Sequence, residues 1–257
     1  MIEKIDFQIK ELESMKKYPQ ELFYIGDKSL LEKPKVAIVG TRKPITYTKL
    51  FTAELAKKLS LAGVVVVSGG AMGVDAIAHQ NSLPHTICVM ANGLNIYYPA
   101  INKNLICEIE AKGVVLSTYP NDATAKGYTF VQRNELVVAL GEVLIITQAD
   151  SGSGSLRSAE FALKMGKKIY VLPHRIGESE GTNQLLKEGL AKVIFTVDSF
   201  LDEIGYGKQN QSLSDPFLMF CSTNPTYDEA IEQYNSKIFE YELMGKIEVK
   251  SGRIVLV

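Results

Sequence analysis

The stretch VVVVSGGAMGVDAIAHQ, residues 64–80, decides the fold of this chain. Four consecutive valines are typical of a strand that is buried on both faces of a parallel sheet, and the residues from Val74 onward have the pattern of a helix. Glycines in the intervening turn, Ser68, Gly69 and Gly70, permit positive φ angles and a close approach of the backbone, while a helix N-terminus offers free N–H groups to an anion. The turn is therefore either an anion site or a tight turn without a ligand.

Other short apolar runs alternate with amphipathic segments along the chain. Strands that alternate with helices of this length form right-handed βαβ units, and these build a parallel sheet with helices on both faces. We therefore expect an α/β, extended Rossmann-like fold with a mostly parallel sheet of about seven strands. The expected strands are residues 36–40, 64–68, 86–90, 113–117, 142–147, 168–173 and 192–196.

Composition divides the chain into three parts. Residues 1–33 are charged and have a helical pattern, which predicts an N-terminal helical extension to a Rossmann-like domain at 34–207. Residues 205–216, GYGKQNQSLSDP, are polar and end in proline, which is typical of a linker. Residues 215–257 combine three helical pieces with two short strands, and this order predicts a winged-helix-like C-terminal domain.

The bulk composition excludes several classes of protein. The 257 residues have a formal net charge of -1, so the chain cannot coat a nucleic acid by bulk charge, and any polyanion site is a local patch. The three cysteines lie far apart, without the spacing of metal ligands, which predicts packing residues in a reducing compartment. No apolar run approaches the ~20 residues of a membrane span. We expect a cytoplasmic protein without membrane contact, metal or cofactor.

Two more of the expected strands end in residues that suit phosphate groups. Because the carboxyl ends of parallel strands lie at one edge of a sheet, three ends rich in glycine, serine and arginine fit a ligand with spaced phosphates. Neither GxxxxGK[ST] nor a GxGxxG after the first strand is present, which argues against a nucleoside triphosphate or a dinucleotide. Alternatively, Arg42 and Lys43 belong to an ordinary solvated loop. The residues concerned are Gly40, Thr41, Arg42 and Lys43 after the first strand, and Ser153, Gly154 and Ser155 after the fifth.

The segment TAKGYTFVQRNELVVALG, residues 124–141, interleaves cations with aromatic rings. Lys126 and Arg133 flank Phe130, and this combination suits a single-stranded nucleic acid because cations bind the phosphates and rings stack on the bases. The alternative is that Phe130 belongs to the core and that Arg133 pairs with an acid such as Glu135.

Residues for acid–base catalysis are few. His79, His85 and His174 are expected to be structural or exposed, and no Ser/His/Asp set can be assigned from their spacing. Asp75 and Glu160 are carboxylates close to glycine-rich turns, and Asp75 is equally explained as an acid in the first turn of a helix. This inventory favours a binding protein over an enzyme.

The motifs together resemble one known family. Read in order from Tyr18 to Ala191, the sequence resembles the DNA-processing protein A (DprA/Smf) family, in which a winged-helix-like appendage is also known. The motifs that carry the resemblance are VAIVGTRKPITYT, VVSGGAMGVDAIAH, TICVMANGLNIYYPAINKNL, GVVLSTYP, FVQRNELVVAL, SGSGSL and LPHRIGESEGTNQLLKEGLA.

The resemblance implies a protein that binds single-stranded DNA, and duplex DNA more weakly. It implies that this protein protects incoming DNA in natural transformation and loads the bacterial strand-exchange recombinase onto it. It also implies a homodimer and no enzymatic activity. In the family, phosphates meet the glycine turn and the arginine after the first strand. The candidate DNA-binding residues are Gly40, Thr41, Arg42, Lys43, Ser68, Gly69, Gly70, Lys126, Phe130, Arg133, Asn134, Ser153, Gly154 and Ser155.

Two regions depart from what DNA binding favours. Glu135 stands where the resembling family usually has arginine, which removes a positive charge near the expected pocket. Residues 215–257 hold seven acidic and four basic residues, whereas a DNA-reading winged helix needs a basic recognition helix. We expect that the C-terminal domain contacts protein or packs on the chain rather than binding duplex DNA.

Two other functions are compatible with the sequence. A nucleoside monophosphate phosphoribohydrolase would use a glycine turn and a following glutamate, here Glu160, although SGSGSLRSAE lacks the paired glycines and the threonine of the usual PGGxGTxxE. A nucleotide sensor would signal through the winged-helix-like domain. Salt dependence separates both from DNA binding, because a polymer that contacts several phosphates loses affinity steeply as salt rises.

Overall fold

The chain forms two compact units in the computed structural model, Met1–Leu201 and Asp202–Val257, and the structure describes residues 2–207 and 215–256. Each unit is considered by itself. Most of the predicted linker at 205–216 lies outside the described residues, which exclude 208–214. The first unit ends at Leu201, so the last residues of the predicted 34–207 domain belong to the second unit.

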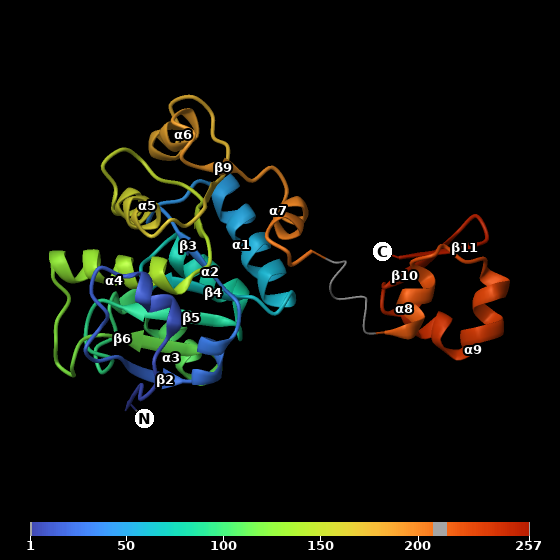
Figure 1. The fold of residues 1–257 in the computed structure, drawn as a ribbon, viewed down its shortest axis with the longest axis horizontal. Coiled ribbons are helices and arrows are strands. Elements are labelled where there is room, and N and C mark those ends of the chain that lie inside the picture. Colours follow the sequence, from blue (N-terminus) through green and yellow to red (C-terminus); the bar gives the residue numbers. More distant parts are fainter. Residues whose placement is uncertain (1, 208–214, 257) are drawn as a thin grey trace. The chain divides into compact units, whose positions relative to one another are not determined.

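A nine-stranded sheet forms the middle of the first unit (Figure 1). The strands are β1 (Glu3–Lys4), β2 (Phe23–Gly26), β3 (Lys35–Val39), β4 (Val65–Gly69), β5 (Thr86–Met90), β6 (Val114–Ser117), β7 (Leu144–Ile146), β8 (Ile169–Val171) and β9 (Lys192–Val193). Their spatial order is β1-β2-β6-β5-β4-β3-β7-β8-β9. All neighbours from β6 to β9 pair in parallel. The predicted Rossmann-like, mostly parallel sheet is confirmed.

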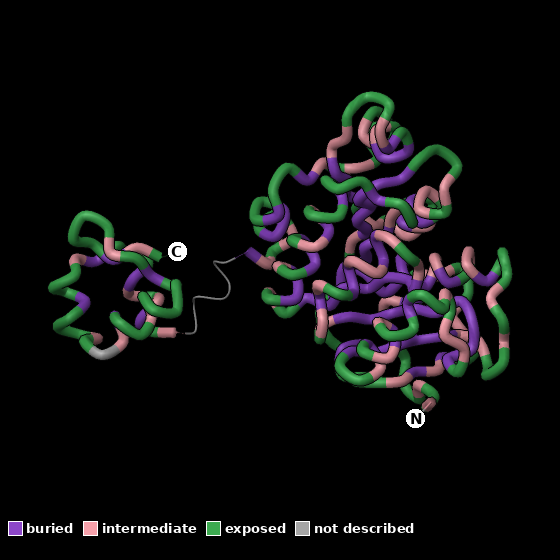
Figure 2. The backbone as a smooth tube through the Cα atoms, turned by 180° about the vertical axis from the view of Figure 1, so that it is seen from behind, coloured by how far each residue is buried: buried purple, intermediate pink, exposed green. Residues whose placement is uncertain are grey.

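Helices cover both faces of this sheet. Successive residues of a strand face opposite sides, and β5 illustrates the result: Val89 packs in one apolar cluster with Leu136 of α4, whereas Cys88 packs in another with Ile109 of α3. Figure 2 shows the central strands as buried backbone. The helices are α1 (Thr46–Leu61), α2 (Val74–Ser82), α3 (Lys103–Lys112), α4 (Gly127–Leu140), α5 (Gly154–Lys164), α6 (Glu180–Lys187) and α7 (Val197–Glu203), with short 3-10 helices η1 (Lys10–Ser14), η2 (Lys28–Glu32) and η3 (Ala100–Asn102).

The first 33 residues correct the helical prediction. They contain β1, β2 and the 3-10 helices η1 and η2, and β2 adds an antiparallel strand to the edge of the sheet at β6. Phe23, Tyr24 and Ile25 are aromatic or β-branched and suit a pleated surface better than a helix. The charged segment around Leu12 forms only η1, which buries Leu12 in the same apolar cluster as α4.

After the end of α7, the described residues of the second unit form two helices and a hairpin. Helix α9 has a non-helical backbone at Tyr234, which divides it into two pieces and gives three helical pieces in all. Phe217, Cys221, Ile238 and Ile254 pack together as its apolar core. The predicted order of elements is therefore confirmed. They are α8 (Pro216–Cys221), α9 (Tyr227–Leu243), β10 (Ile247–Lys250) and β11 (Arg253–Leu256).

Two of the three cysteines take the packing roles that the sequence predicts, whereas Cys107 is half-buried. Cys88 and Cys221 are buried in separate apolar clusters, and neither they nor Cys107 form a disulfide. Among the described residues, no helix combines the length and the apolar character that crossing a bilayer requires.

Candidate functional site

A polar cleft of the first unit lies at the carboxyl ends of β3, β4 and β7. From β3, the strands β4, β5 and β6 follow one another toward one edge of the sheet. The chain then returns to the middle, where β7 pairs with the free side of β3, and the strand order reverses there. Open α/β sheets bind ligands at such a reversal of strand order. The cleft has a volume of about 590 Å³. Its lining residues are Val39, Gly40, Thr41, Arg42, Lys43, Gly69, Ala71, Asp75, Phe130, Arg133, Asn134, Val137, Asp150, Ser153, Gly154, Ser155 and Ser158.

The fold brings most of the sequence-predicted residues to this cleft, with three exceptions. Gly70 lines a smaller pocket beside it. Ser68 is buried below the cleft and donates a hydrogen bond from its hydroxyl to the carbonyl of Ile38 at 2.6 Å. Lys126 is exposed at the start of α4, where its backbone N–H donates to Oγ1 of Thr129 at 2.8 Å, and its side chain is not part of the lining.

The Gly69–Gly70 turn makes room for side chains of the protein itself. A Cβ atom at Gly69 would lie 2.1 Å from Nη1 of Arg133, and one at Gly70 would lie 2.8 Å from Sδ of Met90. The positive φ that the turn was expected to need occurs instead at Gly73, at 79°. The glycines are thus required by close packing, and an anion that approaches Gly69 meets the Arg133 guanidinium.

Arg133 is fixed in this position by neighbouring backbone and side chains. Its side chain is buried, with Nη1 donating to the carbonyl of Val89 at 2.8 Å and Nε donating to Oδ1 of Asn134 at 3.1 Å. Burial lowers the pKa of the guanidinium, which still remains protonated because arginine starts above 12. Glu135 instead accepts a hydrogen bond from the backbone N–H of Lys16 at 3.3 Å. Arg133 therefore does not pair with Glu135, and the acid whose charge acts on its guanidinium is Asp75.

A carboxylate lies in the same cleft. Asp75, in the first turn of α2, is 6% exposed and lines the cleft. Burial raises the pKa of its carboxyl to about 6, against the lowering influence of Arg133, the Ala71 N–H and Arg42. The group is therefore mostly ionised at neutral pH, where it offsets part of the positive charge. The sequence could not distinguish this position from an ordinary acid in a helix's first turn.

The N-terminus of α5 forms another wall of the cleft. Asn134 of α4 reaches this loop and donates from Nδ2 to the carbonyl of Gly154 at 3.4 Å. The buried hydroxyls of Ser153 and Ser158 have no hydrogen-bond partner among the described residues. Together with the free N–H groups of a helix N-terminus, they can donate to the oxygens of an anion. Ser158 was missed from sequence because it lies one turn beyond the glycine-serine stretch.

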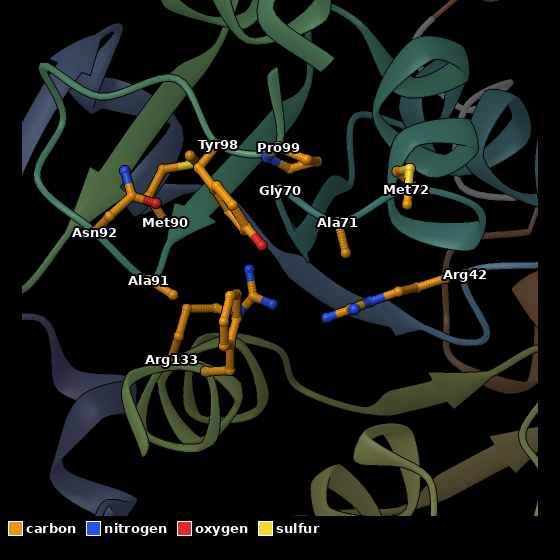
Figure 3. Close-up of a pocket in the computed structure, with 11 residues that line it drawn as sticks. Arg42, Gly70, Ala71, Met72, Met90, Ala91, Asn92, Tyr98, Pro99 and Arg133 are labelled. Atoms are coloured by element: carbon orange, nitrogen blue, oxygen red, sulfur yellow. The ribbon is translucent and has the colours of Figure 1, made fainter. Parts of the chain in front are cut away.

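Aromatic rings line the smaller pocket, which has a volume of about 50 Å³ (Figure 3). The ring centre of Phe130 lies 5.9 Å from the guanidinium carbon of Arg42 and 5.9 Å from the ring centre of Tyr98. Figure 3 shows the guanidinium groups of Arg42 and Arg133 and the Tyr98 hydroxyl directed toward the same opening. Phe130 is therefore a wall of the site and not a core residue.

Sequence reasoning missed Tyr98 and Asn92, which line this pocket. Both follow β5, whose carboxyl end lies at the same edge of the sheet, so the strand-end rule could have found them. Asn92 donates from Nδ2 to the carbonyls of Gly93 and Ile96 at 2.9 and 2.7 Å, which fixes its orientation. Its Oδ1 is buried without a hydrogen-bond partner among the described residues.

The acid–base candidates do not form a catalytic set in the described part of the chain. His79 bonds the carbonyl of Gly69 through Nε2 at 3.0 Å and Oγ1 of Thr86 through Nδ1 at 2.7 Å. Burial lowers the pKa of His79 to about 4, so this histidine is a neutral structural residue. Glu160 is exposed on α5 and is not part of the cleft lining. Residues 2–207 and 215–256 contain no cluster of histidine, cysteine and acidic side chains that could hold a metal.

Fold and cleft together define a Rossmann-like protein with a cationic, ring-lined site at its topological switch point. Residues 6–205 match the family described as DNA recombination-mediator protein A, and the chain belongs to this family. The family recognised from the motifs is thereby confirmed, and the matched range covers nearly all of the first unit and only the first residues of the second.

Individual relatives give the same result. The DNA processing protein DprA of Bacillus subtilis is 32% identical over 80% of this chain and 70% of its own length. Protein Smf of Escherichia coli is 31% identical over 79% of this chain, but the match spans only 55% of its length. The chain thus spans about half the length of some curated relatives.

Two solved structures share the fold of the first unit. The DNA processing protein A of Helicobacter pylori, which binds single-stranded DNA, superimposes with a TM-score of 0.78 at 43% identity and covers 79% of this chain and 95% of its own. DprA of Streptococcus pneumoniae gives a TM-score of 0.73 at 32% identity and covers 79% of this chain and 74% of its own.

Proposed function

We propose that the chain binds single-stranded DNA in the cleft, with phosphates at Arg42, Lys43 and Arg133 and at the N-terminus of α5. The bases lie against Phe130 and Tyr98. The observation that carries this proposal is the convergence of three cations, unpaired hydroxyls and exposed ring faces at one sheet edge. The single-stranded DNA binding of the H. pylori relative supports it.

Single strands are preferred over duplexes because of the rings. A base can stack on Phe130 only when it is free of its own neighbours, and such stacking contributes about 1–3 kcal/mol per base. A duplex offers only its phosphates and therefore binds more weakly. In the cell, this chain protects incoming single strands during natural transformation and hands them to the strand-exchange recombinase, acting by binding, without catalysis, and as a homodimer.

The first test is the salt dependence of binding. Fluorescence anisotropy with an oligo-dT of ~35 nucleotides, longer than the ~4–16 that one small module covers, is measured at several salt concentrations. Three cations at phosphates predict a slope of log affinity against log salt near -2 for a single strand. A mononucleotide competitor should displace little DNA. Full displacement, or no DNA binding, would favour the hydrolase or sensor readings instead.

Arg42→Ala locates the site. We expect about 10- to 100-fold weaker binding of oligo-dT, since a charge-assisted phosphate contact is worth about 1.5–3 kcal/mol. We also expect a salt slope smaller by about 0.7. Lys57→Ala is the matched control, because Lys57 is an exposed base on α1 outside the cleft lining. Equal losses of oligo-dT affinity in the two variants would show that Arg42 acts only through the overall charge of the protein. The cleft would then not be the DNA-binding site.

A further inference from the structure

The second half of α9 exposes an apolar face that the fold of its unit does not use. Phe239 and Leu243 are 73% and 79% exposed and lie four residues apart, on the same side of the helix. The core of the unit is formed by the opposite side, where Ile238 is buried and the ring of Tyr241 packs on Phe217 with their centres 5.0 Å apart. Large exposed apolar side chains that are contiguous mark interaction sites.

The charges around this face identify what it can bind. By the helical period, Glu240 and Glu242 flank the Phe239–Leu243 face on its two sides. Beyond the helix, Nζ of Lys246 lies over the Tyr241 ring, 5.0 Å from its centre. Along its length α9 carries five acids, Asp228, Glu229, Glu232, Glu240 and Glu242, and one base, Lys237.

This charge excludes the role that the corresponding helix has in DNA-reading winged helices. Such a helix enters the major groove and needs cations for the flanking phosphates. An acidic helix is repelled by the same phosphates. The complementary surface has apolar side chains for Phe239 and Leu243 and lysine or arginine for the two flanking glutamates.

We propose that the Phe239–Leu243 face of α9 docks a basic amphipathic helix of a partner protein. The partner's apolar stripe covers Phe239 and Leu243, and its lysines or arginines pair with Glu240 and Glu242, in the manner of a helix laid against an apolar surface. This surface belongs to the C-terminal unit and acts independently of the DNA cleft.

The test uses the full chain and a synthetic helix of about 14 residues, roughly four turns, built from leucine and lysine in amphipathic order and labelled with a fluorophore. Phe239→Ser with Leu243→Ser should weaken its binding about 10-fold. Glu240→Gln with Glu242→Gln should weaken it by a few fold, since exposed charge pairs are worth less. Ile176→Ser, which changes a fully exposed apolar residue of the first unit, is the control and should leave the affinity unchanged.

Several results would overturn this proposal. They are equal affinities in all variants, equal binding of a leucine–glutamate peptide with the same pattern, and absence of peptide binding. Labelled duplex DNA that loses affinity in the Phe239→Ser and Leu243→Ser variant would assign the face to DNA instead. The replaced side chains are exposed, so the variants should fold normally, and an unchanged circular dichroism spectrum checks this. Their affinity for oligo-dT should also be unchanged, which shows that a loss of peptide binding does not come from damage to the DNA cleft.

Discussion

The cleft of the first unit and helix α9 of the second unit differ in charge although both belong to folds that often bind nucleic acid. The cleft gathers Arg42, Lys43 and Arg133 with the α5 N-terminus and with hydroxyls that have no partner in the described part of the chain. Helix α9 carries five acids and one base and exposes phenylalanine and leucine. A fold provides a place for a ligand, whereas the charge at that place decides whether a polyanion can occupy it.

The two regions also differ in their carboxylates. In the cleft, Asp75 is buried beside the guanidinium groups of Arg133 and Arg42, whose positive charges attract its carboxylate. On α9, Glu240 and Glu242 are exposed and act on whatever approaches.

Gly69→Ala should have the largest effect on the cleft. Its Cβ would lie 2.1 Å from Nη1 of Arg133, so the guanidinium must move away from the phosphate position. Losing one charge-assisted contact of about 1.5–3 kcal/mol predicts about 10- to 100-fold weaker binding of oligo-dT by anisotropy. Gly127→Ala is the matched control, because nothing lies within 4 Å of a Cβ there. Equal affinities in both variants would mean that Arg133 does not contact DNA.

Asp75→Asn should change the pH dependence of DNA binding. The folded protein holds the pKa of Asp75 at about 6, above its usual 3.8. Ionisation of this buried group therefore costs stability, and the cost appears as pH rises from about 4 to about 6 and is complete above that range. A nearby phosphate raises this pKa further, so binding takes up a proton, and affinity falls as pH rises through and above 6.

Affinity for oligo-dT measured from about pH 6 to about pH 8 checks this linkage. The affinity of the wild type should fall several-fold as pH rises over this range. The Asp75→Asn variant should bind oligo-dT more tightly than the wild type near pH 8, and its affinity should vary less with pH. Three other groups near Asp75 do not titrate in this range. Arg133 stays protonated, burial lowers the pKa of His79 to about 4, and burial raises the pKa of Cys88 to about 12. Parallel pH profiles for the two proteins would contradict the assignment.

Removing residues 208–257 should have the smallest effect on DNA. The acidic α9 contributes no favourable phosphate contact, so affinity for oligo-dT should change by less than about 3-fold. The same anisotropy titration measures it, with circular dichroism to verify that the remaining unit folds. Loss of nearly all affinity would show that the C-terminal unit holds DNA despite its charge.

Much of the architecture was predictable because it follows from local patterns. A run of four valines, 64–67, is typical of a strand whose two faces are both covered. Strand β4 is indeed buried along its whole length. The helical prediction for residues 1–33 was wrong because the local pattern there did not indicate the strands that this segment adds to the sheet. Its charged residues around Leu12 suit a helix locally but form only the 3-10 helix η1, whereas the aromatic and β-branched residues at 23–25 favour the strand that pairs with β6.

The amino-acid pattern was enough to predict that Gly69, Arg42 and the 153–155 loop share one edge, because the carboxyl ends of parallel strands lie at the same edge of a sheet. The role of each residue at that edge follows from long-range packing. It folds Arg133 over Gly69, leaves Lys126 outside the lining and buries Asp75 between cations. These relations join residues far apart in the chain, and packing alone sets such distances.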